Sequence, residues 1–123
     1  MVLVDTCGWI EWLTDSSLSE KYSKYFTQVE SIIVPSSIQY ELYKWVRLKQ
    51  DMQYALEAVA LTEQAKVVPL TTAIALSAGD MAIEYKLSFA DAIIYATAQF
   101  YNAELITSDK HFKSLTNVVY FAK

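Results

Sequence analysis

Short runs of β-branched and aliphatic residues alternate with longer segments of helical periodicity along the 123 residues of the chain. Five short runs are expected to form strands: residues 2–5, 32–34, a run beginning at 67–68, 105–107 and 118–121. The intervening segments favour helices over residues 8–13, 18–29, about 36–50, about 51–65, about 72–85 and 89–101. Strands joined by helices cannot pair as hairpins. The pattern therefore predicts a three-layer α/β/α fold with a central, mainly parallel five-stranded sheet.

The composition is typical of one densely packed domain. Apolar residues make up 54% of the chain, and it has only two glycines and two prolines, so we expect a single domain over residues 1–123. The longest uncharged run, residues 67–79, is too short to span a bilayer. The single cysteine, Cys7, cannot form an internal disulfide. These features, and the lack of a basic leader before Asp5, predict a cytoplasmic protein.

The net charge of −4 restricts the ways in which the chain can bind nucleic acid. It argues against a simple binding module that holds phosphates on a broad basic surface. It does not argue against a nuclease whose acidic residues surround divalent cations, because the ions reverse the local field that a phosphate meets.

Two predicted strands lead directly into aspartates. Asp5 closes the first strand, and Asp109 follows residues 105–107 after one serine. In a parallel sheet the carboxyl ends of the strands share one edge, which is where ligands bind in α/β folds. We therefore expect both carboxylates at that edge.

Two further acids fall within apolar helical patterns. Glu41 lies three residues after Ile38, and Asp91 lies three residues before Ile94. An inward carboxylate needs a partner, and neither helix offers an inward lysine or arginine. A divalent cation would satisfy all four acids, and this all-oxygen set favours Mg²⁺ or Mn²⁺ over Zn²⁺.

Each acid also has a purely structural interpretation. Asp91 follows Ser88 at the spacing of a capping box, Asp109 can cap the next turn, and Asp5 can be an ordinary strand-end residue. Glu41 is solvated if the helical phase is shifted by one residue. The metal-site hypothesis depends on all four acids meeting at one place.

Four segments resemble the successive motifs of PIN-domain nucleases, especially the VapC toxins of bacterial toxin–antitoxin pairs. They are Val-Leu-Val-Asp5-Thr6-Cys-Gly-Trp, the mid-chain Glu41, Phe-Ala-Asp91-Ala-Ile-Ile-Tyr and Leu-Ile-Thr107-Ser-Asp109-Lys-His. The resemblance assigns the three central acidic positions to Asp5, Glu41 and Asp91, with Glu30 a distant rival to Glu41. It assigns a more variable fourth position to Asp109, and supporting hydroxyls to Thr6 and Thr107.

The resemblance implies an endoribonuclease that uses Mg²⁺ or Mn²⁺ to activate a water molecule against RNA phosphodiesters. It also implies a homodimer and a small VapB-like antitoxin as partner. We place the dimer interface around residues 54–61 and 74–83. The antitoxin is expected on the aromatic-rich helices of the first 45 residues, with an arginine inserted among the acids.

Two other functions remain open on the sequence alone: a PIN-like RNA-processing or DNA/flap nuclease that is not a toxin, and a catalytically silent interaction module. His111, the only histidine, is expected on the turn after the fourth strand and outside the acid–base chemistry.

Overall fold

A computed structural model describes all 123 residues. Its five strands form one sheet in the order β3-β2-β1-β4-β5. Their bounds are β1 Val2–Val4, β2 Ile32–Pro35, β3 Lys66–Val68, β4 Glu104–Thr107 and β5 Val118–Tyr120. Every neighbouring pair is parallel. The predicted five-stranded sheet is confirmed, and it is parallel throughout.

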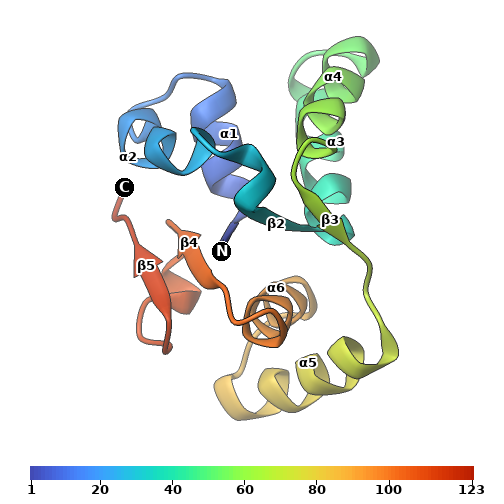
Figure 1. Ribbon diagram of the computed structural model, residues 1–123, viewed down its shortest axis with the longest axis vertical. Helices are drawn as coiled ribbons and strands as arrows, with labels where there is room; N and C mark the ends of the chain where they lie inside the picture. The colour runs from blue at the N-terminus through green and yellow to red at the C-terminus, as the bar shows by residue number, and fades with distance from the viewer.

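Six α-helices pack on the sheet: α1 Thr6–Leu13, α2 Ser19–Ser23, α3 Ser36–Lys49, α4 Met52–Thr62, α5 Thr72–Tyr85 and α6 Phe89–Phe100. In Figure 1, α1 to α4 lie above the strands and α5 and α6 lie below them. This arrangement confirms the three-layer α/β/α fold. The core between the layers includes the fully buried Leu3, Ile33 and Leu105 of the central strands.

The continuous helix predicted over residues 18–29 is wrong. The α-helix ends at Ser23, and two 3₁₀ turns follow, η1 Lys24–Phe26 and η2 Val29–Ser31. The side chains of Ser23 and Thr27 donate hydrogen bonds to backbone carbonyls three residues earlier. Such short-range bonds compete with the bonding pattern of a regular helix. Periodicity alone therefore overestimated the length of this helix.

The first helix begins two residues earlier than predicted, directly after β1. The Asp5 side chain accepts a hydrogen bond from the Thr6 backbone amide at 2.8 Å and caps this helix. Gly8 permits close packing there, because a Cβ at this position would lie 2.5 Å from a Val4 methyl and 2.6 Å from the Tyr22 ring. The sharp turn from β1 into α1 thus depends on both the aspartate and the glycine.

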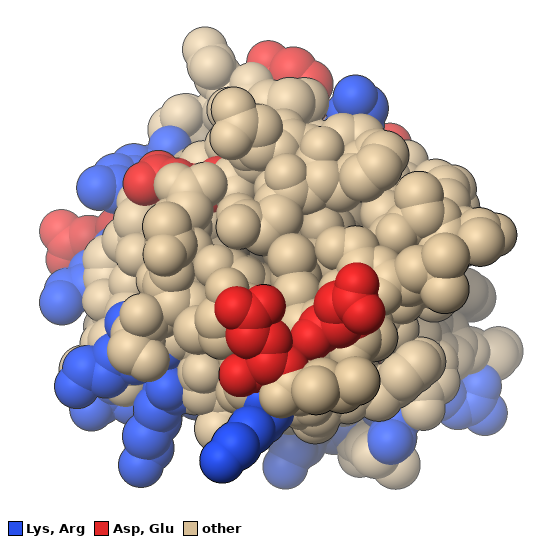
Figure 2. Space-filling model, turned by 90° about the horizontal axis from the view of Figure 1, so that it is seen from below, with Lys and Arg blue, Asp and Glu red and all other residues tan.

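Figure 2 shows the face that α5 forms below the sheet. Most of this face carries no charged side chain, and a few acidic side chains gather near its centre. Leu76 and Ile83 of α5 are 68% and 82% exposed, whereas Ile74 and Ala78 pack inward. None of the helices is both long enough and apolar enough to cross a membrane.

The strand order locates the point where ligands are expected. The chain moves from β1 outward to β2 and β3, then crosses back to β4 on the other side of β1. The connections that leave β1 and β4 therefore diverge between these neighbouring strands. In open parallel sheets, this divergence opens a crevice at the carboxyl ends of the strands.

Candidate metal-dependent active site

Asp5 lies at the carboxyl end of β1 and is only 6% exposed. Its Oδ2 atom accepts a hydrogen bond of 2.7 Å from the Thr107 hydroxyl at the end of β4. Burial, with a smaller effect from the nearby Glu41 and Asp109 charges, raises the pKa of Asp5 to about 6. The bonds from Thr107 and the Thr6 amide offset part of this rise. The carboxylate therefore sits in an environment that favours a compensating positive charge.

Glu41 reaches the same edge from α3. Its Oε1 atom accepts a hydrogen bond of 2.8 Å from the Thr6 hydroxyl at the start of α1. Burial raises the pKa of Glu41, and the Asp91 and Asp109 charges act in the same direction. The two threonines, Thr6 and Thr107, each orient one carboxylate. The supporting role that the family resemblance implies for these two threonines stays a prediction.

Asp91 and Asp109 complete the acidic group from α6 and from the loop after β4. Burial and the charge of Asp109 raise the pKa of Asp91. The Ser88 hydroxyl accepts a hydrogen bond from the Asp91 amide, so Ser88 caps α6. The Asp91 carboxylate is directed instead to His111. The capping interpretation is therefore right for Ser88 and leaves the Asp91 carboxylate available to the site.

Asp109 has a structural role as well as a place in the cluster. Its Oδ1 accepts a hydrogen bond of 2.9 Å from the His111 amide and caps the 3₁₀ turn η3 Lys110–Phe112. The Asp109 amide in turn donates to the Thr107 hydroxyl at 2.9 Å. One hydroxyl thus links the turn that carries Asp109 to the Asp5 carboxylate.

His111 is closer to the acids than the sequence analysis expected. It lies on the turn after β4, as predicted, and its Nδ1 lies 3.1 Å from Asp91 Oδ2 and 3.2 Å from Asp109 Oδ1. Its side chain is 73% exposed. The signal in the sequence was its position two residues after Asp109 on a tight turn, which brings both side chains to the same side.

The donor set fits a hard divalent cation. Ligand atoms of Asp91, Asp109 and His111 lie within 4.8 Å of one another, a spacing that one ion can bridge. Asp5 and Glu41 lie outside that group but interact electrostatically with its aspartates. No lysine or arginine forms a salt bridge with any of these acids. Carboxylate oxygens are the ligands that Mg²⁺ and Mn²⁺ prefer.

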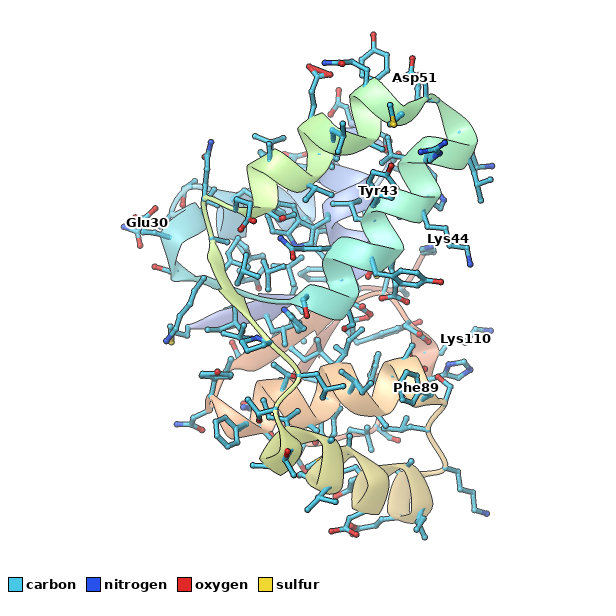
Figure 3. The ribbon with its side chains drawn as sticks, turned by 90° about the vertical axis from the view of Figure 1, so that its right-hand side faces the viewer. Glu30, Tyr43, Lys44, Asp51, Phe89 and Lys110 are labelled. Carbon is cyan, nitrogen blue, oxygen red and sulfur yellow. The ribbon has the colours of Figure 1, made fainter.

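Glu30, the rival to Glu41, lies away from this site. It belongs to η2, which immediately precedes β2 and therefore lies toward the amino end of the sheet. Figure 3 shows Glu30 on the side opposite to Lys44, Phe89 and Lys110, with its side chain directed outward. The structure thus separates it from the acidic group.

The loop that follows β4 is fixed from α1 and α2. The Tyr22 hydroxyl and the Ser108 hydroxyl are 2.6 Å apart, and the Ser108 amide donates to the Cys7 sulfur at 3.4 Å. Burial raises the pKa of the Cys7 thiol, so the neutral thiol is favoured. Cys7 is a structural contact of this loop and is unsuited to act as a nucleophile.

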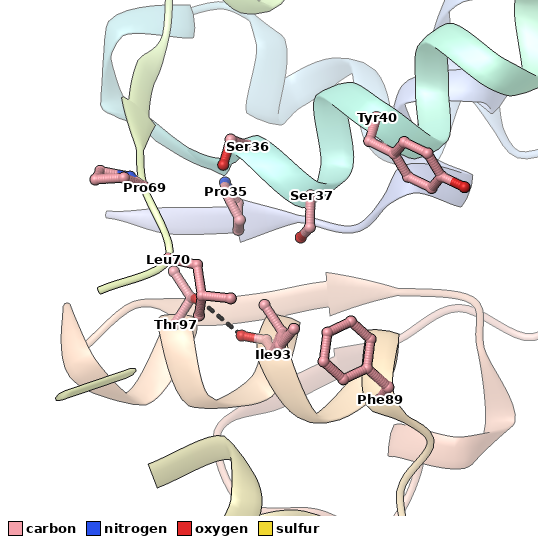
Figure 4. Close-up of a pocket in the computed structure, with 9 residues that line it drawn as sticks. All are labelled: Pro35, Ser36, Ser37, Tyr40, Pro69, Leu70, Phe89, Ile93 and Thr97. Atoms are coloured by element: carbon pink, nitrogen blue, oxygen red, sulfur yellow. Dashed lines mark hydrogen bonds between the residues drawn. The ribbon is translucent and has the colours of Figure 1, made fainter. Parts of the chain in front are cut away.

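An apolar pocket of about 340 Å³ opens beside the acids, between α3 and α6. Figure 4 shows Tyr40 and Phe89 on its two sides and Ser37 directed into it. The Ser37 hydroxyl is buried and has no hydrogen-bond partner. None of the four acids lines this pocket, so it adjoins the candidate metal site without forming it.

The family model of the PIN domain matches residues 2–118. The chain belongs to the PIN-domain family. Membership supports a nuclease function, and PIN nucleases typically use divalent metals, for which the acidic group described above is the candidate site. No curated protein sequence matches this PIN domain.

The solved structures that share the fold of this PIN domain include the following three. A toxin–antitoxin complex from Klebsiella pneumoniae is 24% identical, with a TM-score of 0.83 and all of both chains covered. VapBC2 from Rickettsia felis, bound to a promoter DNA fragment, is 15% identical, with a TM-score of 0.78 and coverage of 99% and 98%. VapC20 from Mycobacterium tuberculosis, a sarcin–ricin loop cleaving toxin, is 16% identical, with a TM-score of 0.77 and coverage of 96% and 97%.

Proposed function

We propose that this PIN domain is an Mg²⁺- or Mn²⁺-dependent endoribonuclease and the toxin of a VapBC-type toxin–antitoxin pair. The observation that carries the proposal is the convergence of four carboxylates from separate elements, with no lysine or arginine paired to them. The pKa values of Asp5, Glu41 and Asp91 are all raised. Such a cluster is stabilised when cations bind to it.

In the proposed mechanism, Asp5, Glu41, Asp91 and Asp109 hold one or two cations. Bound cations would supply Lewis acidity that activates a water molecule and stabilises charge on the phosphate. Thr107 and Thr6 keep the Asp5 and Glu41 carboxylates oriented through their hydrogen bonds. Because oriented carboxylates need little rearrangement on binding, these bonds favour a fixed site geometry. No side chain needs to form a covalent intermediate.

The choice of RNA as substrate and of a toxin role draws on the resemblance of the sequence motifs to VapC toxins. The solved toxins have the same fold as this chain, and this similarity also supports the choice. An RNA-cutting toxin would meet its substrate in the cytoplasm, where we propose that the chain acts. We also propose that residues 1–123 fold as one domain, since one sheet and one connected core include its elements.

The function is tested by cleavage of single-stranded RNA with Mn²⁺, with Mg²⁺ and with excess EDTA, beside a DNA strand of the same sequence. We expect cleavage of RNA alone, and only with a cation. Glu41→Gln should lower the rate by about 100-fold or more. Glu30→Gln makes the same change outside the site and should leave the rate unchanged. Equal cleavage in EDTA would contradict the metal mechanism, and preferential cleavage of DNA would contradict the choice of substrate.

An antitoxin was expected on the aromatic-rich helices of the first 45 residues, but few of these aromatic rings are exposed. Trp9, Tyr22 and Phe26 are buried, and Trp12 stacks on Phe26 with ring centres 4.1 Å apart. Most of these rings therefore belong to the core. Tyr40 is the one that is largely exposed, at 65%.

We propose that the antitoxin binds a neighbouring groove between α1, α3 and α4. The groove has a volume of about 380 Å³, and Leu13, Trp45, Tyr54 and Leu61 contribute its apolar walls. An amphipathic helix fits such a groove through side chains spaced three to four residues apart. An arginine that follows this helix in the antitoxin would pair with the acids of the site. Tyr54→Glu should abolish inhibition by a co-expressed VapB-like protein and preserve cleavage of RNA.

We propose that the chain forms a homodimer through α5. The largely uncharged surface around the acidic side chains in Figure 2 and the exposed side chains of Leu76 and Ile83 support this half of the predicted interface. Tyr54 and Leu61 of the other half line the groove assigned to the antitoxin.

A further inference from the structure

One face of α3 combines aromatic and basic side chains beside the acidic site. We call this set, Tyr40, Tyr43, Lys44, Arg47 and Leu48, the α3 face. Its two cations follow Glu41 by three and six residues, which places them roughly 4.5 and 9 Å farther along the helix axis. The face therefore begins at a site acid and leads away from it.

Two adjoining hollows follow the α3 face. The first, of about 300 Å³, is lined by Thr6 and Glu41 of the acidic site together with Tyr40, Lys44 and Leu48. The second, of about 410 Å³, shares Tyr40, Lys44 and Leu48 and extends to Arg47. The hollows thus connect the acidic site with the only arginine of the chain.

The cations of this face are free to bind an anion. Neither Lys44 nor Arg47 forms a salt bridge, and both are exposed. Lys44 Nζ lies 5.9 Å from the centre of the Tyr40 ring, and Arg47 donates a hydrogen bond of 3.0 Å to the Tyr43 hydroxyl. The chain has a net charge of −4, but Lys44 and Arg47 make this part of its surface positively charged.

Cations interleaved with aromatic rings suit one class of ligand. Single-stranded nucleic acids bind grooves in which basic groups contact phosphates and aromatic rings stack against bases. The Tyr40 ring is 65% exposed and is therefore available for stacking. Figure 3 shows Lys44 reaching outward on the same side as Phe89 and Lys110. A strand lying on this side would pass the acidic site.

We propose that the α3 face binds single-stranded RNA on one side of the scissile phosphate, with Lys44 and Arg47 contacting phosphates and Tyr40 stacking against a base. This inference rests on the proposed ribonuclease function. It assigns substrate binding to residues that hold no metal. The acidic site and the α3 face can therefore be tested separately.

The test measures fluorescence anisotropy of a labelled single-stranded RNA in Mg²⁺ buffer, with Asp5→Asn in every protein to prevent cleavage. We expect Lys44→Ala with Arg47→Ala to weaken binding by about tenfold and to lower the salt dependence of log K by about 1.4, since each phosphate contact contributes about 0.7. The matched control removes two charges elsewhere, with Lys24→Ala and Lys66→Ala. This control should bind within about twofold of the parent.

Two further variants test whether the Tyr40 ring stacks against a base. Tyr40→Ala should weaken binding by about five- to 150-fold, as expected for the loss of one stacked base. Tyr40→Phe keeps the ring and should restore binding to the parent level. In the wild-type background, Mn²⁺ affinity should be the same for both Tyr40 variants, because neither change alters a charge or a residue of the acidic site.

The outcomes separate this inference from the proposed function. If wild-type protein cleaves RNA but Lys44→Ala/Arg47→Ala binds RNA as well as the control, the α3 face is not the binding surface. If the same variant changes the mass measured by light scattering, the face lies between copies of the chain, and the inference is again wrong. If wild-type protein neither binds nor cleaves RNA, both the proposed function and this inference are wrong.

Discussion

The Thr107 hydroxyl at the end of β4 donates a hydrogen bond of 2.7 Å to the Asp5 carboxylate at the end of β1. These residues are 102 positions apart in the sequence. Strand pairing brings them together, since β1 and β4 are parallel neighbours. The bond lowers the pKa of Asp5 against the effect of burial, so it favours the ionised form that a cation requires.

We predict that Thr107→Val shifts the pH profile of metal-dependent cleavage to higher pH by about one to two units. The substitution removes a hydrogen bond to a charged group, which contributes about 1.5–3 kcal/mol, and the Asp5 carboxyl then ionises less readily. Thr107→Ser should retain the original profile. Thr97→Val removes another buried hydroxyl, which bonds to the Ile93 carbonyl. An equal shift in Thr97→Val would show that the effect is not specific to Asp5.

Metal-free stability should fall as pH rises from about 4 to 7. Burial raises the pKa of Asp5 from 3.8 to about 6, so the folded state favours the protonated form. The stabilisation from this proton is complete below the unfolded pKa and is lost as pH rises through the folded value. A difference of about two units between the folded and unfolded pKa corresponds to about 3 kcal/mol in the free energy of unfolding.

Asp5→Asn should remove that part of the pH dependence and raise stability at pH 7 in EDTA. Urea unfolding at pH 4.5 and pH 7 measures both effects. Glu41 and Asp91 have raised pKa values as well, so a smaller slope of the same sign should remain. Identical pH dependence in wild type and Asp5→Asn would contradict the assignment.

His111 should contribute to cation binding together with Asp91 and Asp109. Its Nδ1 lies 3.1 Å from Asp91 Oδ2 and 3.2 Å from Asp109 Oδ1, within the group of ligand atoms that one ion can bridge. We predict that His111→Ala weakens Mn²⁺ binding by about tenfold. Titration calorimetry measures this. Unchanged affinity in His111→Ala would show that the acids hold the ion without the imidazole.

Much of the fold was accessible from the sequence because its signals are local. The runs at 32–34 and 105–107 are too apolar to be solvated, and the helices between them exclude hairpins, so the parallel sheet followed. The segment after α2 was not accessible in this way. Its helical periodicity persists to Val29, but the hydroxyls of Ser23 and Thr27 bond locally and change the backbone.

The site was predicted less completely. Strand-end and helical positions indicated all four acids, and the structure places them at one edge of the sheet. The contacts of His111 depend on the direction of the η3 turn relative to α6, which sequence spacing does not determine. The burial of Trp9 and Tyr22 likewise depends on how α1 and α2 pack together.

We predict that Leu76→Glu with Ile83→Glu converts a wild-type dimer to a monomer at micromolar concentration. Two charges on the exposed face of α5 would be buried without partners in the proposed interface. Leu56→Glu on α4 is the matched control, since Leu56 is also exposed, at 52%. Light scattering gives the mass of each protein. A monomeric wild type would contradict the dimer, and dissociation by Leu56→Glu alone would assign the interface to α4.

The acids at the carboxyl edge of the sheet should bind a divalent cation. A titration of Mn²⁺ followed by the electron paramagnetic resonance signal of the free ion measures this binding. We predict that wild-type protein removes one or two equivalents of Mn²⁺ and that Asp91→Asn weakens this binding by about tenfold or more. Asp80→Asn changes an exposed aspartate of α5 and should bind as wild type does. Equal Mn²⁺ binding by wild type and Asp91→Asn, or none by wild type, would show that these acids do not form a cation site.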